Sequence, residues 1–249
     1  MRDANFVPGK MKNQGKRLNF WSLRAFTLIE VLICVAIIGV LVALSFPAWR
    51  KIKDTALRSK DASNLRSQAT AVFAYAGDHE NVLPGRINRG IALPSTVTSS
   101  SKRTYYLSTV LIDAGYCPNE DGIWKSTVEY GANQAGVAYV VNSGSSSLPS
   151  YFFGNRSNTA GATLYEPKRI VALKSNLNPE KYPSSKTEQP LSQIWMVTNA
   201  DGENYSSDAA GGVSNAVGDN VRTPWGGRNY VYFDGHVEFK KSGDYPSSN

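Results

Sequence analysis

Cysteine and histidine are scarce in this chain of 249 residues, which contains two of each: Cys34, Cys117, His79 and His236. Two cysteines cannot hold together a small disulfide-rich fold, which needs several bridges. The two histidines lie far apart and lack cysteine or carboxylate neighbours at the spacing of a zinc site or a catalytic group. We therefore expect no enzymatic activity.

The net charge of +7 and the pI of about 9.3 are unevenly distributed. Residues 1–25 carry +5, residues 26–66 carry +3, and residues 67–249 carry −1. A basic domain often binds nucleic acid. Because this basic character belongs to the N-terminal quarter alone, we do not expect nucleic acid as a partner.

One dense apolar run extends from Phe26 to Trp49, and between Val31 and Leu44 no residue is charged. As a helix it would span ~36 Å, enough to cross a hydrocarbon core of roughly 30 Å. A secretory signal peptide has a shorter apolar region of ~7–15 residues followed by a small-residue cleavage site. Here the run ends in Pro-Ala-Trp-Arg-Lys at positions 47–51, without such a site. The run therefore predicts a membrane span over residues 26–49.

Residues 24–32, Arg-Ala-Phe-Thr-Leu-Ile-Glu-Val-Leu, closely resemble the processing motif of type IV prepilins and type II secretion pseudopilins. The resemblance implies that residues 1–25, which end in Arg24 and Ala25, are a basic leader. It implies that prepilin peptidase cuts between Ala25 and Phe26 and that the new amine of Phe26 is methylated. Glu30 would then pair with the terminal amine of a neighbouring subunit. The family normally has Gly before the cut, so Ala25 predicts slower cleavage.

Beyond Trp49 the sequence predicts an amphipathic stalk helix over residues 50–77. Apolar residues recur there at helical spacing, and Gly77-Asp78 is expected to end the helix. Those residues are Ala62, Leu65, Ala69, Val72, Phe73 and Ala76. Gly39 and Pro47 are expected points of helix flexibility, although Gly39 equally fits close packing of helices.

Six basic residues follow the apolar run: Arg50, Lys51, Lys53, Arg58, Lys60 and Arg66. Attraction to anionic lipid headgroups is the favoured interpretation, ahead of salt bridges between subunits. DNA binding is disfavoured because almost no aromatic residues interleave with the basic ones. Five basic residues on the leader side against six here leave the positive-inside rule undecided. Only the resemblance places the leader in the cytoplasm, the span in the inner membrane and the C-terminal part outside.

Residues 78–249 predict an α+β head. A helix capped by Gly115 is expected over 107–114, with strands at 137–141, 193–198, 229–233 and 236–240. Asp234-Gly235 predicts a two-residue type I′ hairpin turn. The predicted fold is therefore α+β and pilin-like, a long N-terminal helix with a small antiparallel sheet. Residues 233–237 also resemble a C-terminal hairpin common in one group of pilin-like proteins, in part of which a His occupies the position of Pro224.

An oxygen-rich loop contains Asn199, Asp201, Glu203 and Asp208. Its spacing differs from that of a helix-loop-helix calcium site. Some pseudopilins hold calcium in a C-terminal loop, so calcium remains a hypothesis here beside that of a solvated loop. No other cofactor is expected.

These features together predict a structural subunit that assembles with other pilin-like subunits into a type IV pilus or a type II secretion pseudopilus. Its implied partners are prepilin peptidase, the methyltransferase and the inner membrane. The alternative is a single-pass membrane-anchored binding or sensor protein that does not polymerise. A chain that begins at Phe26 would distinguish the first from the second.

Overall fold

The computed structural model describes residues 26–125, 127, 137–142, 152–154, 166–174, 190–202, 204 and 223–246. The chain divides between Trp49 and Arg50 into two compact units. A single helix, α1 (Leu28–Asp78), forms most of the described part of the first unit and opens the second.

The described part of the first unit is an apolar helix whose large side chains are exposed. Phe26 is 79% exposed and Trp49 71% exposed, and the large apolar residues between them are exposed as well. By length and composition α1 is able to cross a membrane. It runs unbroken through Gly39 and Pro47, so flexibility at these residues stays a prediction.

The second unit contains a five-stranded antiparallel sheet whose strands follow one another in sequence order. They are β1 (Gly90–Ala92), β2 (Val137–Val141), β3 (Trp195–Asn199), β4 (Gly227–Tyr232) and β5 (Val237–Lys241). The predicted strands correspond to β2 through β5. β1 was missed because three residues are too few to show alternation. The long helix and the antiparallel sheet confirm the α+β class.

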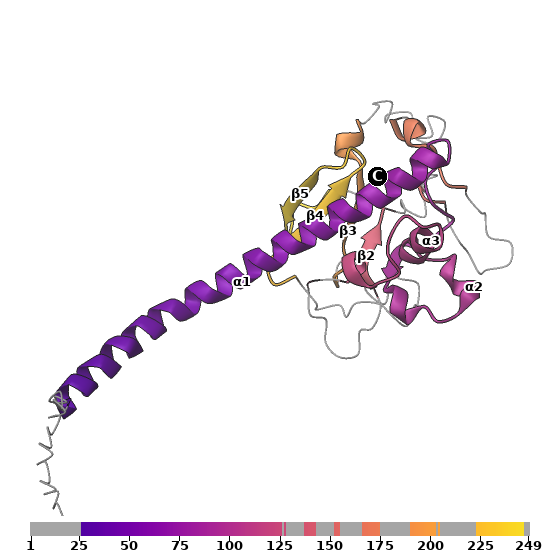
Figure 1. The fold of residues 1–249 in the computed structure, drawn as a ribbon. Helices are drawn as coiled ribbons and strands as arrows, with labels where there is room; N and C mark the ends of the chain where they lie inside the picture. Colours follow the sequence, from indigo (N-terminus) through magenta and orange to yellow (C-terminus); the bar gives the residue numbers. More distant parts are fainter. Residues whose placement is uncertain are drawn as a thin grey trace, which may run out of the picture. The chain divides into compact units, whose positions relative to one another are not determined.

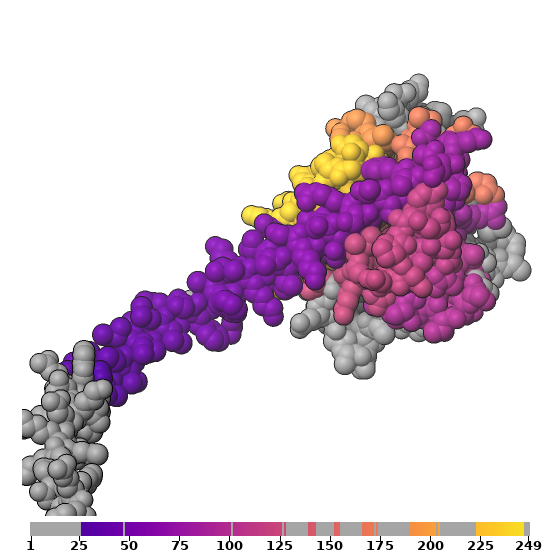
Figure 2. Space-filling model, viewed as in Figure 1, coloured from indigo at the N-terminus to yellow at the C-terminus, as the bar shows by residue number. Residues whose placement is uncertain are grey.

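Residues of α1 after Arg50 cover one face of the sheet (Figure 1). Leu65 and Val72 of α1 belong to one buried cluster with Val197 of β3 and Val231 of β4. Figure 2 shows the outer surface of this helix between the C-terminal strands, in yellow, and residues of the α3 region, in magenta. The predicted apolar stripe is confirmed, because Leu65, Ala69, Val72 and Ala76 are buried and Ala62 and Phe73 are half-buried.

Short helices complete the described part of the second unit. α3 (Leu107–Asp113) contributes Leu107 and Leu111 to the core. Its predicted cap is confirmed, since Gly115 has a φ of 85° and its N–H donates to the carbonyl of Ile112 at 2.9 Å. The others are α2 (Ser100–Arg103) and the 3₁₀ helices Pro94–Thr96, Gly122–Trp124, Ile170–Lys174 and Leu191–Gln193.

α1 ends at Asp78, but Gly77 is not the residue that turns the chain. Glu80 and Asn81 adopt positive φ angles of 54° and 63°. The N–H of Asn81 donates to the carbonyl of Ala76 at 2.7 Å. The end of the helix was placed correctly, whereas its cause was assigned to the wrong residue.

The β4–β5 hairpin is present, but the predicted type I′ turn is wrong. Gly235 has a φ of 89°, whereas Asp234 has no positive φ, and a type I′ turn needs both. The N–H of Gly235 donates to the carbonyl of Tyr232 at 2.9 Å, and the N–H of Tyr232 donates to that of His236 at 3.0 Å. This pattern is typical of a type I turn followed by a left-handed glycine. Asp234 supports the turn by accepting from the N–H of His236 at 3.1 Å.

Candidate functional site

The start of α1 is closed by a reciprocal cap between Thr27 and Glu30. The backbone N–H and the hydroxyl of Thr27 donate to Glu30 Oε2 at 2.8 and 2.9 Å. In return the N–H of Glu30 donates to Thr27 Oγ1 at 3.3 Å. This arrangement is a capping box, which satisfies two amide groups that a helix start would otherwise leave without partners.

Glu30 therefore has a role within its own chain that the sequence reasoning missed. The signal was the Thr-x-x-Glu spacing that begins at Thr27. Both bonds from Thr27 use Oε2, and Oε1 has no hydrogen-bond partner among the described residues. Glu30 can thus cap its helix and still accept a further donor, such as an amine. Arg24 and Ala25 lie outside the described residues, and Phe26 is exposed beside this cap.

Gly39 lies midway along the exposed apolar helix. A side chain added there would meet nothing within 4 Å. Ala36, Ile37, Val40 and Leu41 line a shallow apolar hollow on the same stretch. Small residues on an exposed apolar helix allow a second helix to approach closely.

A buried carboxylate joins α1 to three strands in the second unit. Asp61 is fully buried. Its Oδ1 accepts from Tyr139 Oη of β2 at 2.9 Å and from Asn199 Nδ2 of β3 at 2.7 Å. Its Oδ2 accepts from Asn229 Nδ2 of β4 at 2.8 Å. Burial raises the pKa of the Asp61 carboxyl, while these three hydrogen bonds act in the opposite direction.

The partners of Asp61 are themselves fixed. The backbone N–H of Asn229 donates to Asn199 Oδ1 at 2.9 Å, across the β3–β4 pair. Asn64, one turn after Asp61, donates from Nδ2 to Tyr139 Oη at 3.3 Å. Tyr139 can therefore give its own proton to Asp61. No cation pairs with Asp61 among the residues that the structure describes, so the charge is met by neutral donors.

A second buried charge, Arg228 of β4, is paired. Its Nε and Nη2 donate to the two carboxylate oxygens of Asp201 at 2.7 and 2.6 Å. The guanidinium carbon lies 3.8 Å from the ring centre of Tyr245. Burial would lower the pKa of Arg228, but the bonds to Asp201 outweigh it and raise the pKa. Arg228 and Asp201 form a buried bidentate ion pair, and this role was not predicted.

Comparison with known proteins identifies the N-terminal segment. A family model described as the prokaryotic N-terminal methylation motif matches residues 24–46. The chain is 28% identical over 115 residues to the type IV major alpha-pilin of Moraxella bovis, covering 45% of this chain and 72% of that protein. The chain is a type IV pilin-like protein.

Fimbrial protein Q of Moraxella bovis is also similar to this pilin-like chain, at 27% identity over 113 residues, again covering 45% of this chain and 72% of the relative. No solved structure matches the chain. The exposed apolar helix and the likeness to pilins fit anchoring in a membrane and a place in a pilus.

The calcium hypothesis for the pilin-like chain stays a prediction. Glu203 and Asp208 lie outside the described residues. Asn199 and Asp201 are described: Asn199 Oδ1 accepts from the N–H of Asn229, and the carboxylate of Asp201 accepts from Arg228. No group of three or more His, Cys, Asp or Glu residues within the described ranges is placed to hold a metal ion.

His79 and His236 each contact a group that is close to them in the sequence. His79 Nδ1 lies 2.7 Å from the carbonyl of Tyr75, and the two rings stack. His236 Nδ1 lies 2.6 Å from Asp234 Oδ1 in the hairpin. Burial raises the pKa of Cys117 to about 11, which keeps it a thiol at neutral pH. Cys34 is exposed on the apolar helix.

Proposed function

We propose that this pilin-like chain is a structural subunit without catalytic activity, cut after Ala25 and built into a helical filament. Prepilin peptidase removes residues 1–25, and the methyltransferase modifies the amine of Phe26. Before assembly the mature subunit is anchored in the inner membrane, with residues 78–249 outside the cytoplasm. Its apolar helices then bundle with those of other pilin-like subunits in a type IV pilus or a type II secretion pseudopilus.

The observation that carries this proposal is the coincidence of three features at one place. The methylation motif matches residues 24–46, the apolar helix begins at Leu28, and its cap leaves one oxygen of Glu30 free of bonds to described residues. A free Phe26 amine is the donor that this oxygen would accept from a neighbouring subunit. Since a buried lone carboxylate is costly, such pairing would favour one register of subunits.

The test is the N-terminal mass of the chain extracted from membranes of the source cells. We expect a chain that begins at Phe26, with or without one methyl group. Ala25→Gly restores the residue usual in the family and should increase the processed fraction, whereas Ala25→Leu should block the cut. A wild-type chain that begins at Met1, or one cut after Trp49, would contradict the proposal and favour an anchored protein that does not polymerise.

A second measurement separates processing from assembly. Glu30→Gln keeps the size of the side chain and an oxygen able to cap Thr27, but removes the charge that would pair with an amine. We expect normal cleavage with loss of incorporation into filaments. Ser45→Ala, a change elsewhere on the apolar helix, is the control and should assemble normally. Normal incorporation of Glu30→Gln would refute the pairing role.

A further inference from the structure

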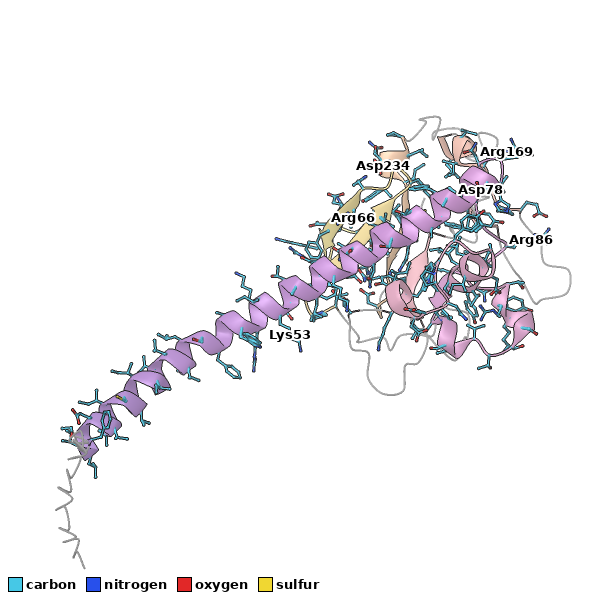
Figure 3. The ribbon with its side chains drawn as sticks, in the orientation of Figure 1. Lys53, Arg66, Asp78, Arg86, Arg169 and Asp234 are labelled. Atoms are coloured by element: carbon cyan, nitrogen blue, oxygen red, sulfur yellow. The ribbon has the colours of Figure 1, made fainter. Side chains whose placement is uncertain are left out.

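The exposed apolar surface of α1 ends at Ile52. Ile52, 63% exposed, is the last large apolar residue on the described part of α1 with this much exposure. The first fully buried residue of the same helix is Asp61. Between them the helix is neither an apolar surface nor part of the packed core. Figure 3 marks Lys53 on this stretch.

Three cations lie at this level, and we call Arg50, Lys51 and Lys53 the basic turn. All three are exposed. Arg50 and Lys53 are three residues apart, a rise of about 4.5 Å along the helix. The headgroup layer on each side of a bilayer is roughly 5–7 Å thick. The basic turn therefore fits within one headgroup layer.

The length of the apolar run fits the same placement. From Leu28, where α1 begins, to Trp49 the helix rises about 32 Å, which crosses a hydrocarbon core of roughly 30 Å. Trp49, next to Arg50, is the residue type that concentrates at the membrane surface. With the run inside the bilayer, the basic turn lies at the phosphate level.

The later basic residues differ from the basic turn. Arg58 lies about 12 Å beyond Arg50 along the helix, past the headgroup layer. Its guanidinium carbon is 4.7 Å from the ring centre of Phe239, so it packs against β5. Lys60 and Arg66 are exposed on the part of α1 that covers the sheet. The six basic residues that follow the apolar run, between positions 50 and 66, therefore divide into two groups of three.

We propose that the basic turn binds the phosphate groups of anionic lipids and so sets the depth at which the subunit is held in the bilayer. This inference rests on the proposed membrane anchoring. Charge complementarity selects the partner, because Asp54 is the only acid among residues 50–60. Each Lys or Arg near an anionic surface contributes an attraction equivalent to about fivefold in affinity.

The test uses the full chain in phosphatidylcholine vesicles that contain brominated phosphatidylglycerol or, at the same mole fraction, brominated phosphatidylcholine. Bromine quenches nearby tryptophan, and Trp49→Phe isolates the signal of Trp49 from the other four tryptophans. We expect Trp49 to report an enrichment of the anionic lipid of about fivefold. The preference should weaken at high salt.

Two triple variants make the comparison specific. Arg50→Gln/Lys51→Gln/Lys53→Gln should lose the preference for the anionic lipid. Lys60→Gln/Arg66→Gln/Lys102→Gln removes the same charge from exposed residues elsewhere and should keep it.

Each other outcome is decisive. Equal quenching by both lipids would show that Trp49 lies in the bilayer but that the basic turn selects no lipid, which overturns this inference alone. Quenching by neither lipid would overturn the membrane anchoring as well. Retention of a DNA duplex on the vesicles by the basic turn, without a lipid preference, would assign these residues to nucleic acid instead.

Discussion

Asp61 offers the sharpest prediction about how the second unit is held together. Its carboxylate is the common acceptor for Tyr139, Asn199 and Asn229, which come from three different strands. Asp61→Ala removes this acceptor and leaves three buried donors without it. Asp61→Asn keeps the shape of the side chain, but its amide group must face at least one amide of the same kind.

The expected cost follows from these bonds. A buried donor left unsatisfied costs about 1–3 kcal/mol, and Asp61→Ala takes the acceptor from three of them. We therefore expect Asp61→Ala to lower the free energy of unfolding by about 3 kcal/mol or more. Asp61→Asn should cost about 1–3 kcal/mol, because one acceptor remains.

The assay is urea unfolding of the full chain in a mild detergent, followed by tryptophan fluorescence. Trp124 and Trp195 are buried in the second unit and report its unfolding. Asp54→Asn is the control, since it makes the same charge change outside the core and should stay within about 0.5 kcal/mol. A cost below about 1 kcal/mol for Asp61→Ala would refute the reasoning, because three buried donors would then lose their acceptor at less than the cost of one.

The pH dependence supplies an independent check on Asp61. Its pKa is raised in the folded state above the ordinary 3.8, so the folded chain holds this proton more tightly than the unfolded chain. The corresponding stability is complete below about pH 3.8 and declines as the pH rises through the raised pKa. Asp61→Asn lacks this titration. Its stability deficit relative to wild type should therefore be largest at acidic pH and shrink toward neutral pH.

Three further predictions concern single residues. Thr27→Ala should cost the start of α1 about 1 kcal/mol, seen as faster amide exchange at residues 28–31, while Thr27→Ser should preserve protection. Gly227→Ala drives a Cβ into the carbonyl oxygen of Lys240 and should destabilise the chain by about 1–3 kcal/mol, whereas Gly122→Ala meets nothing within 4 Å and should unfold like wild type. Cys117 should be alkylated far more slowly than a free cysteine at neutral pH and speed up toward pH 11.

Local patterns account for what the sequence could predict. The apolar spacing of Leu65, Ala69 and Val72 can be recognised within one short segment of sequence. The helix cap at Gly115 can be recognised in the same way. The Asp234 turn was misassigned because the same dipeptide serves two turn types, and only the pairing of Val231 with Val237 decides between them. Short β1 carries no pattern of its own and exists because β2 pairs with it.

Asp61 shows why the rest of the site could not be predicted from the sequence. It lies four residues before Leu65, in phase with the buried stripe, and a search for apolar spacing passes over it. Its partners Asn199 and Asn229 are 138 and 168 residues away, so no local reading could join them. In this chain a stripe of apolar residues alone would permit α1 to slide or rotate on the sheet. A shift of one residue in β3 or β4 would turn Asn199 or Asn229 to the other face. The three bonds to the Asp61 carboxylate are all made only in a placement of helix and strands that brings these residues together, a requirement that apolar contact by itself does not impose.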